Sequence, residues 1–187
     1  ELGGHHQVGA DLVQLPPQGS MRPADVVRVS DVAARGGARL IFPSLSLLAP
    51  TPWEQAEDLV STSWAPSLIV RIAPPLGRQA DALISRTVTA LLDTPVSGPI
   101  HVLHVDDLVR FLVAAVGTDN TGVVDLGTPD VTNVISARHV LSTVDPRPST
   151  RRIRPWPRLA PALDLTALHD DWQFECGWSA VDAVADT

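Results

Sequence analysis

The sequence has no tyrosine, no lysine, a single cysteine and no long apolar run among its 187 residues. Without tyrosine or lysine, no site in the chain can use a phenol or a side-chain amine to move a proton. Cys176 has no partner for an internal disulfide, which favours a reducing, cytoplasmic setting over secretion. Since a membrane-spanning helix needs about 18 or more apolar residues in a row, we expect no membrane association.

Positive charge is also scarce. All basic residues are arginines, and 14 of them stand against 21 acids, which gives a net charge of −7. A general nucleic-acid binder needs a basic face for phosphate contacts, so we expect no nucleic-acid partner. The apolar share of 44% is that of an ordinary globular protein. The start of the chain lacks the basic flank and apolar centre of a secretion signal. Because the chain begins with Glu1 and not with methionine, we expect it to be part of a longer protein.

What the sequence does contain is an alternation of buried strands and amphipathic helices. The run "ARLIFPS" predicts a strand, and "TPWEQAEDLVSTS" after it spaces apolar residues along one helical face. Pro23 at the start and Gly36–Gly37 at the end bound an earlier helix. Repeated strand–helix–strand order calls for a parallel sheet with helical crossovers. The expected strands are 10–16, 38–44, 66–75 and 122–129, and the expected helices lie within 22–37, 51–63, 81–92 and 136–144.

The segment "IHVLHVDDLVRFLVAAVGT" changes from a period of two to a period of 3.6 near its two aspartates. We expect one aspartate to cap the helix that follows. The predicted buried stripe of that helix consists of Leu108, Val109, Leu112, Val113 and Val116.

The order of these motifs resembles the extended short-chain dehydrogenase/reductase family, the NAD-dependent epimerases and dehydratases. The resemblance covers roughly residues 10–187 and is carried by "LIFPSLS", "AEDLV", "VRIAPPLG", "HVDDLVRFLVAAV" with "GVVDLG", and the closing segment from Asp164. It implies an α/β fold: a partial Rossmann-like parallel sheet flanked by helices, with a small C-terminal α+β or irregular segment like a substrate lobe. The expected division is a flexible N-terminus (1–9), a truncated Rossmann-like core (10–140) and the C-terminal segment (141–187).

The family's reactive residues are absent from this resemblance. It places the helper serine at Leu45, the catalytic tyrosine at Ala49 and the lysine at Trp53, with Ser44 and Ser46 flanking the first position. None of these side chains makes a catalytic set, so we expect no catalytic residue. The family's glycine-rich phosphate turn is missing as well. We therefore expect no cofactor on this chain alone, and NAD(P) only if an upstream N-terminal part is present.

Histidine, aspartate and cysteine side chains could in principle bind a metal or act as a nucleophile. His101, His104, Asp106 and Asp107 do not converge on one ion, because residues three apart in a strand point to opposite faces, and we expect no metal. Cys176 has no neighbouring histidine and is interpreted as a core thiol.

A basic block follows residue 145. Arginine pairs with phosphate through two hydrogen bonds, so Arg151, Arg152 and Arg154 are candidates for a diphosphate or an acidic partner. The alternative is a solvated linker held extended by its prolines. The whole block consists of Arg147, Arg151, Arg152, Arg154 and Arg158.

Three functions remain open. The first is a catalytically degenerate epimerase/dehydratase-like domain that acts as a binding, scaffolding or regulatory module. The second is a nucleotide-sugar epimerase, dehydratase or reductase whose cofactor-binding half is supplied by upstream sequence or a partner chain. The third is an assembly module that forms a homodimer through helix 52–63, with Trp53, Leu59 and Val60 against a copy of themselves.

Overall fold

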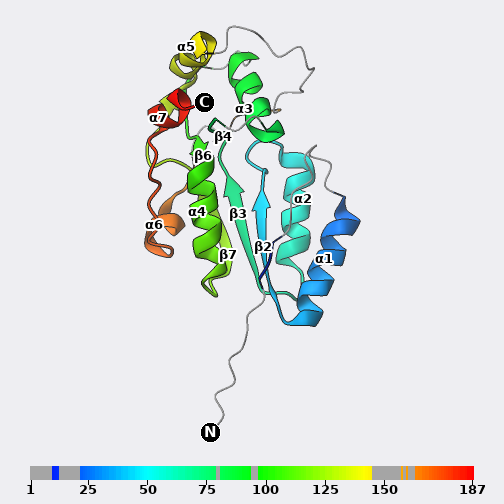
Figure 1. The fold of residues 1–187 in the computed structure, drawn as a ribbon. Helices are drawn as coiled ribbons and strands as arrows, with labels where there is room; N and C mark the ends of the chain where they lie inside the picture. Colours follow the sequence, from blue (N-terminus) through cyan, green and yellow to red (C-terminus); the bar gives the residue numbers. More distant parts are fainter. Residues whose placement is uncertain are drawn as a thin grey trace.

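A four-stranded parallel sheet forms the centre of the protein, which was studied as a computed structural model. The structure describes residues 10–12, 22–78, 81–93, 97–144, 157, 159 and 163–187. The strand order is β1-β2-β3-β7 and every neighbouring pair is parallel, so that β2 and β3 point the same way in Figure 1. The strands are β1 (Ala10–Leu12), β2 (Arg39–Ser44), β3 (Ser67–Ile72) and β7 (Gly122–Leu126).

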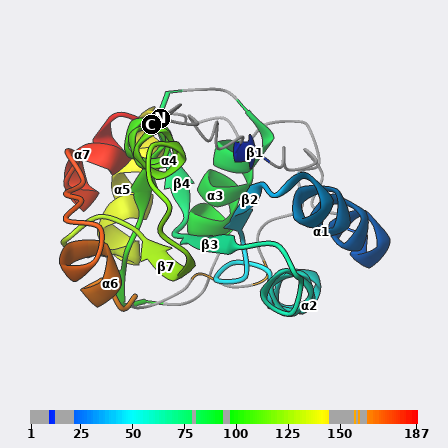
Figure 2. The ribbon, with the colours of Figure 1, turned by 90° about the horizontal axis from the view of Figure 1, so that it is seen from below.

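Helices lie on both faces of this sheet. Helices α1 (Pro23–Gly36) and α2 (Pro50–Ser61) are on one face, and α4 (Val105–Val116) is on the other (Figure 2). Helix α1 starts with its proline and ends at Gly37, whose φ of 65° is the left-handed conformation that glycine adopts easily. The α/β fold with a parallel sheet flanked by helices is therefore confirmed.

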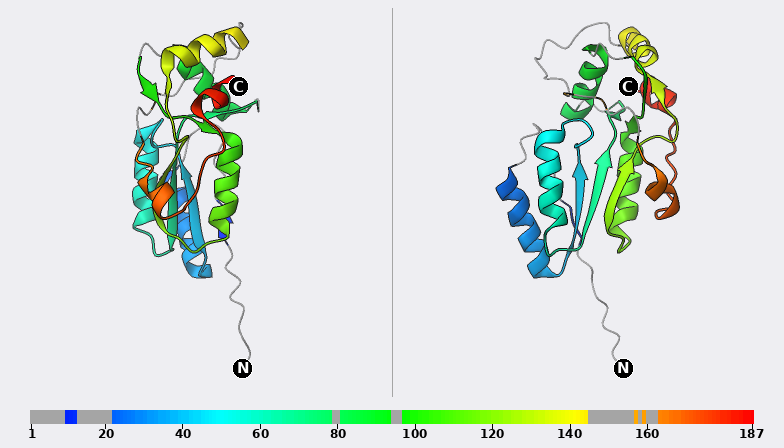
Figure 3. Two further views of the ribbon diagram at one scale, coloured as in Figure 1. Left: turned by 90° about the vertical axis from the view of Figure 1, so that its left-hand side faces the viewer. Right: turned by 180° about the vertical axis from the view of Figure 1, so that it is seen from behind.

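A second layer of structure lies beyond the carboxyl ends of β2 and β3 (Figure 1). It contains two small sheets, one pairing β4 (Pro75–Leu76) with β6 (Leu103–His104) and one pairing β5 (Pro99–Ile100) with β8 (Thr132–Asn133). The helices of this layer are α3 (Ala82–Asp93), α5 (Val134–Val144) and α7 (Ala180–Ala185). Helix α6 (Thr166–Asp170) contacts β7, at the side of the sheet away from α1 (Figure 3).

Two apolar clusters follow this layering. The larger one joins the main sheet to its helices and also takes in Leu168 from α6. The smaller one holds the second layer together and consists of Leu76, Leu91, Ile100, Val102, Val134, Ala137, Leu141, Ala180, Ala183 and Val184. The division at residue 140 stays a prediction, although α5 has residues on both sides of it, and the predicted N-terminal segment 1–9 lies outside the described residues.

Helix α4 differs from its prediction in two ways. Its N-cap is His104, whose ring Nδ1 accepts a hydrogen bond from the Asp106 backbone N–H at 3.2 Å, so neither aspartate is the cap. The predicted stripe is also wrong in part. Three of its valines are exposed, whereas the fully buried face of the helix carries Phe111, Ala115 and the charged Asp107. The exposed fractions are 58% for Val109, 69% for Val113 and 50% for Val116.

None of the helices in the described ranges has the length and apolar character needed to cross a bilayer.

Candidate functional site

The carboxyl ends of the parallel strands are the first place to look for a site, because open α/β sheets bind ligands in the crevice outside these ends. Ser44 is the last residue of β2, and a turn leads from it into α2 at Pro50. Arg78 follows β4, which comes directly after β3. The second layer of the fold covers the same end of the sheet (Figure 1).

Ser44 belongs to a buried network instead of an open site. Its hydroxyl donates to Glu57 Oε1 at 2.6 Å, and its oxygen accepts from the Ser46 backbone N–H at 3.2 Å. The other carboxylate oxygen of Glu57 accepts from Arg71 Nε at 2.9 Å and from Nη2 at 2.8 Å. The hydrogen bond with Glu57 raises the pKa of Arg71 above its usual value, despite the opposing effect of burial. Both Ser44 and Ser46 are buried, so neither is exposed to a ligand.

The three positions at which the resemblance implies catalytic residues carry only apolar side chains. Leu45 is buried and Ala49 is half-buried. Trp53 is only 1% exposed and packs against Phe42, with their ring centroids 6.1 Å apart. These positions lie close to Ser44 and Ser46 in the sequence. The side chains of Leu45, Ala49 and Trp53 cannot exchange a proton with a ligand.

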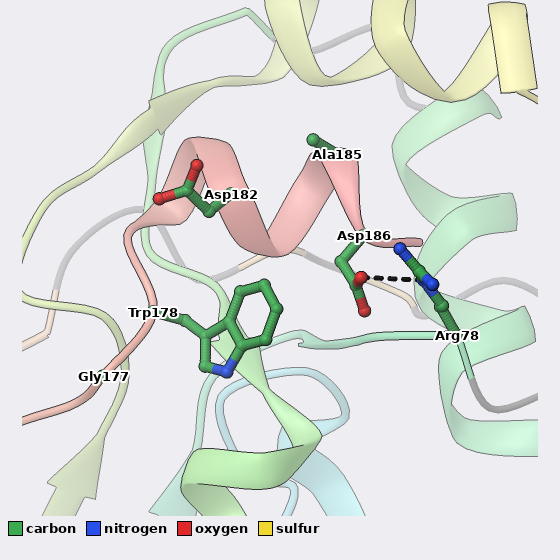
Figure 4. A pocket seen from close by; sticks show the side chains of 6 residues that line it. All are labelled: Arg78, Gly177, Trp178, Asp182, Ala185 and Asp186. Carbon is green, nitrogen blue, oxygen red and sulfur yellow. Dashed lines mark ion pairs between the residues drawn. The ribbon is translucent and has the colours of Figure 1, made fainter.

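A pocket of about 440 Å³ lies in the second layer, and its walls come from segments far apart in the sequence (Figure 4). Arg78 lies on one side, and the closing segment with α7 forms the rest. The lining residues are Arg78, Gly177, Trp178, Asp182, Ala185 and Asp186.

The pocket is held together by polar and ring contacts. Arg78 Nε contacts Asp186 Oδ1 at 2.8 Å, the ion pair drawn in Figure 4. His104 Nε2 lies 3.2 Å from Asp186 Oδ2. The His104 ring also stacks on the Trp178 ring, with centroids 3.8 Å apart and an interplanar angle of 16°. In the tautomer in which His104 Nδ1 accepts from the Asp106 backbone N–H, Nε2 carries the ring proton and faces Asp186.

Asp107 fixes the closing segment that carries the tryptophan. This carboxylate is fully buried and accepts hydrogen bonds from the Gly177 N–H at 2.9 Å and the Trp178 N–H at 3.1 Å. Arg110 Nη1 contacts it at 2.5 Å. The pocket wall therefore depends on a charged side chain that lies 70 residues away in the sequence.

The comparisons with known proteins agree with this architecture. No family model and no curated protein matches the chain. Among solved structures, it matches a UDP-glucuronic acid 4-epimerase from Bacillus cereus in complex with NAD, with a TM-score of 0.63 and 14% identity over 86% of this chain and 64% of that one. A UDP-N-acetylglucosamine 4-epimerase from Bacillus cereus gives 0.66 and 9% over 94% and 74%, respectively. A UDP-glucose 4-epimerase from Thermotoga maritima with UDP-glucose gives 0.62 and 16% over 89% and 70%.

The chain has the fold of these epimerases. The resemblance predicted from the order of motifs is thus confirmed at the level of the fold. The chain spans 62–64% of the length of the first three solved structures that it matches.

Within this epimerase fold, the other sequence candidates are placed as follows. His101 Nδ1 lies 2.9 Å from the Thr128 carbonyl oxygen and shares no partner with His104. In the part of the chain that the structure describes, no three His, Cys, Asp or Glu side chains are grouped to hold a metal ion. The candidates Arg151, Arg152 and Arg154 lie outside the described residues, as do Arg147 and Arg158.

Cys176 lines a smaller pocket of about 260 Å³ beside α6. Its thiol donates to the Gly127 carbonyl oxygen, with 3.2 Å between Sγ and O. Burial, reinforced by the negative charge of Asp107, raises the pKa of the Cys176 thiol to about 12. Such a thiol carries almost no thiolate at neutral pH, which agrees with a structural role.

The roles of Glu57, Arg71 and the pocket residues were not predicted from the sequence. A charged residue inside an apolar strand, such as Arg71, was a usable signal, because a buried charge needs a partner. The pocket had no local signal, because Arg78 and Trp178 are 100 positions apart and meet only through tertiary structure.

Proposed function

We propose that this chain is a binding module built on the fold of nucleotide-sugar epimerases, and that it holds a nucleotide-sugar-like ligand without converting it. We place it in the cytoplasm, as one part of a larger protein. The observation that carries the proposal is the apolar surroundings of Ala49 and the burial of Trp53 in the core at the two positions where the family's proton-transferring pair is implied.

The chemistry supports a loss of turnover. Epimerisation by hydride and proton transfer needs a general acid or base within hydrogen-bond reach of the reacting hydroxyl. Ser44 is the nearest hydroxyl with a carboxylate partner, but it is fully buried and is committed to Glu57. Binding, by contrast, needs only a concave surface with a few fixed polar groups, which the pocket beside Trp178 offers.

Isothermal titration calorimetry of the purified chain tests this proposal. NAD, NADP and UDP-glucose are each titrated at millimolar concentration. We expect heat of binding with UDP-glucose and none with either dinucleotide. Arg78→Gln should weaken UDP-glucose binding several-fold, because it removes the exposed guanidinium that can donate hydrogen bonds to the sugar hydroxyls in the pocket. Arg28→Gln, which changes an exposed arginine on α1, is the matched control and should bind like the wild type.

Two results would overturn the proposal. The first is binding of NAD or NADP by the chain alone, since it would show a cofactor site where none is expected. The second is conversion of UDP-glucose to UDP-galactose by the chain with added NAD, followed by anion-exchange chromatography of the nucleotide sugars.

A second candidate function is an enzyme completed by another segment. It is favoured by the position of β1 at the edge of the four-stranded sheet, where a further parallel strand can add, and by the exposed valines of α4. A doubly wound dinucleotide-binding sheet continues past that point with strands that carry the phosphate turn. To test it, the chain is expressed together with the protein encoded directly upstream, and the purified longer protein is titrated with NAD. Binding by the longer protein and not by the chain alone supports this candidate.

A homodimer through helix 52–63 also stays a proposal. Trp53 and Val60 are buried in the chain's own core, so a copy cannot use them as the sequence suggested. The positions that α2 exposes are Thr51, Glu54, Gln55, Asp58 and Ser61. Sedimentation velocity over a hundredfold range of concentration tests the dimer, and a constant monomer mass would rule it out.

A further inference from the structure

We propose that the pocket between Arg78 and Trp178 takes an uncharged, hydroxyl-rich ring, such as the ring of a hexose, and that it rejects phosphate groups. The inference rests on the proposed function in one respect, namely that the chain binds ligands instead of transforming them. It goes further by assigning a chemical class to one site.

The described lining of the pocket does not favour an anion. It contains one guanidinium, on Arg78, and two carboxylates, on Asp182 and Asp186. The guanidinium is paired with Asp186 through Nε, so its positive charge is already balanced. Asp182 then leaves the described lining with a net negative charge. A diphosphate would face the exposed carboxylate of Asp182 at short range, where like charges repel and water screens part of the repulsion.

The start of α7 does not supply a phosphate site either. Helix N-termini attract anions because several backbone N–H groups point outward. In α7 the Asp182 N–H already donates to the Ser179 hydroxyl oxygen at 3.1 Å, and the Asp182 carboxylate itself lies in the first turn. The Ser179 hydroxyl also donates to Asp182 Oδ2 at 2.6 Å. The helix therefore carries its own anion at the position that a phosphate would need.

The Trp178 ring provides a fixed apolar platform. His104 covers one face of the indole at 3.8 Å, so a ligand can pack only on the rest of the ring. The backbone N–H of Trp178 is fixed by Asp107, which limits movement of the platform. Figure 4 shows the ring between the Asp182 carboxylate and the Asp186–Arg78 ion pair.

This combination matches the two sides of a sugar ring. The C–H face of a hexose is apolar and packs flat on an indole, whereas its hydroxyl groups both donate and accept hydrogen bonds. Asp182 and Asp186 are acceptors and Arg78 is a donor, so both roles of a hydroxyl have a partner around the platform. The volume of about 440 Å³ accommodates one such ring with bound water.

A series of three probes of nearly equal size tests the inference: methyl α-glucoside, which is neutral, glucosamine, which is cationic, and glucose 1-phosphate, which is anionic. Binding to the full chain is measured by saturation-transfer NMR at millimolar concentration. We expect the glucoside to bind at least tenfold more tightly than glucose 1-phosphate, and no more weakly than glucosamine.

Matched variants place the binding in this pocket. Trp178→Ala should abolish the glucoside signal, whereas Trp64→Ala, which removes a tryptophan that is 96% exposed elsewhere, should leave it unchanged. Asp182→Asn should improve glucose 1-phosphate binding severalfold relative to glucoside binding, because it removes the negative charge and keeps one acceptor oxygen. If Trp178→Ala does not fold, the Asp182→Asn result alone still decides between a neutral and an anionic ligand.

Each outcome is decisive. Equal or tighter binding of glucose 1-phosphate or a clear preference for glucosamine overturns the inference. So does the absence of any binding, or binding that none of the pocket variants changes. Binding of UDP-glucose without any glucoside binding leaves the proposed function standing and removes this inference. Glucoside binding that depends on Trp178, without UDP-glucose binding, supports this inference and removes the proposed function.

Discussion

Asp107 shows at the residue scale how one buried charge supports the candidate site. A carboxylate without contact with water is tolerated only when its oxygens are fully hydrogen-bonded. Two backbone N–H groups of the closing segment and the Arg110 guanidinium meet this need. The same contacts attach the segment that carries Trp178 to the start of α4. Asp107 is therefore a positioning residue for the pocket.

Replacement of this carboxylate gives the first prediction. Asp107→Asn keeps the shape of the side chain but loses the charge and turns one acceptor into a donor that faces a backbone N–H. We expect the free energy of unfolding to fall by about 3 kcal/mol, measured by urea denaturation. Asp106→Asn is the control: it changes the exposed neighbour and should cost less than about 0.5 kcal/mol. Equal losses for both variants would contradict the role given to Asp107.

Gly77 is the second residue with a specific requirement. Its φ of 140° is a conformation that other residues rarely adopt, and a Cβ atom there would lie 2.8 Å from Val105 Cγ2. The same atom would lie 3.2 Å from His104 Nε2, which belongs to the pocket network. Strain and overlap therefore act together.

We expect Gly77→Ala to lower stability by about 2 kcal/mol and to lower the melting temperature by several degrees, as measured by circular dichroism. Gly117→Ala provides a comparison at a glycine with a φ of −80°, where alanine fits without strain and should change stability by less than about 1 kcal/mol. An unchanged melting temperature for Gly77→Ala would show that the loop relaxes freely.

At the scale of elements, Glu57 connects α2 to two neighbouring strands. Its carboxylate accepts hydrogen bonds from the Ser44 hydroxyl at the end of β2 and from the Arg71 guanidinium on β3. The carboxylate is nearly buried, whereas the Arg71 side chain is 39% exposed, so water screens part of this ion pair. The network links α2 to β3 and, across the turn that contains Ser46 and Ala49, to the end of β2.

Glu57→Gln should destabilise the fold by about 2 kcal/mol, because Arg71 loses its charged partner in a half-buried site. A double-mutant cycle with Arg71→Leu isolates the pair: the double variant should lose less stability than the sum of the two single variants. Additive losses in urea denaturation would mean that the ion pair contributes nothing measurable.

Elements with local signals were the predictable part of the fold. Helix α1 could be bounded by Pro23 and Gly37, and β2 and β3 by short apolar runs, because these features act within a few residues. The orientation of α4 could not be predicted, since its buried face is decided by contacts between Asp107 and residues some 70 positions away. The two-residue strands β4, β5, β6 and β8 are equally non-local.

The residues of the candidate site could not be predicted from the sequence. The composition already excludes tyrosine and lysine chemistry, and burial of Trp53 adds the physical reason why that position has no substitute. The pocket residues gave no pattern, because a helix, a loop and a closing segment meet there. Pockets of this kind are formed by the chain topology, which cannot be read from local patterns in a single sequence.

For the whole molecule, pH dependence follows from Asp125 on β7. Burial is the main cause that raises the pKa of Asp125 above its ordinary 3.8, and a hydrogen bond from the Asp164 backbone N–H together with the charge of Arg71 opposes it. In the range just above 3.8 the folded protein still holds this proton, whereas the unfolded chain has released it. Stability contributed by Asp125 therefore falls as the pH rises through that range.

Asp164 acts in the opposite direction. Hydrogen bonds from the Thr166 side chain and backbone lower the pKa of Asp164, so its contribution is lost as the pH falls below the ordinary value. We expect Asp125→Asn to remove the loss of stability that this group causes as the pH rises above 3.8, in urea denaturation at a series of pH values. Asp31→Asn, on the exposed side of α1, should keep the wild-type profile. A wild-type profile for Asp125→Asn would contradict the burial effect.

The strand order also determines which strands can pair first during folding. Leu40 pairs with Ser67, only 27 positions later, whereas Leu68 pairs with Gly122, 54 positions along the chain. Closing the longer loop costs more chain entropy, and sheets built from such distant pairs form slowly. During synthesis β2 and β3 can pair long before β7 leaves the ribosome. One side of β3 then stays open for the time needed to make α3, the small strands and α4, and a nascent chain at that stage is at its greatest risk of aggregation.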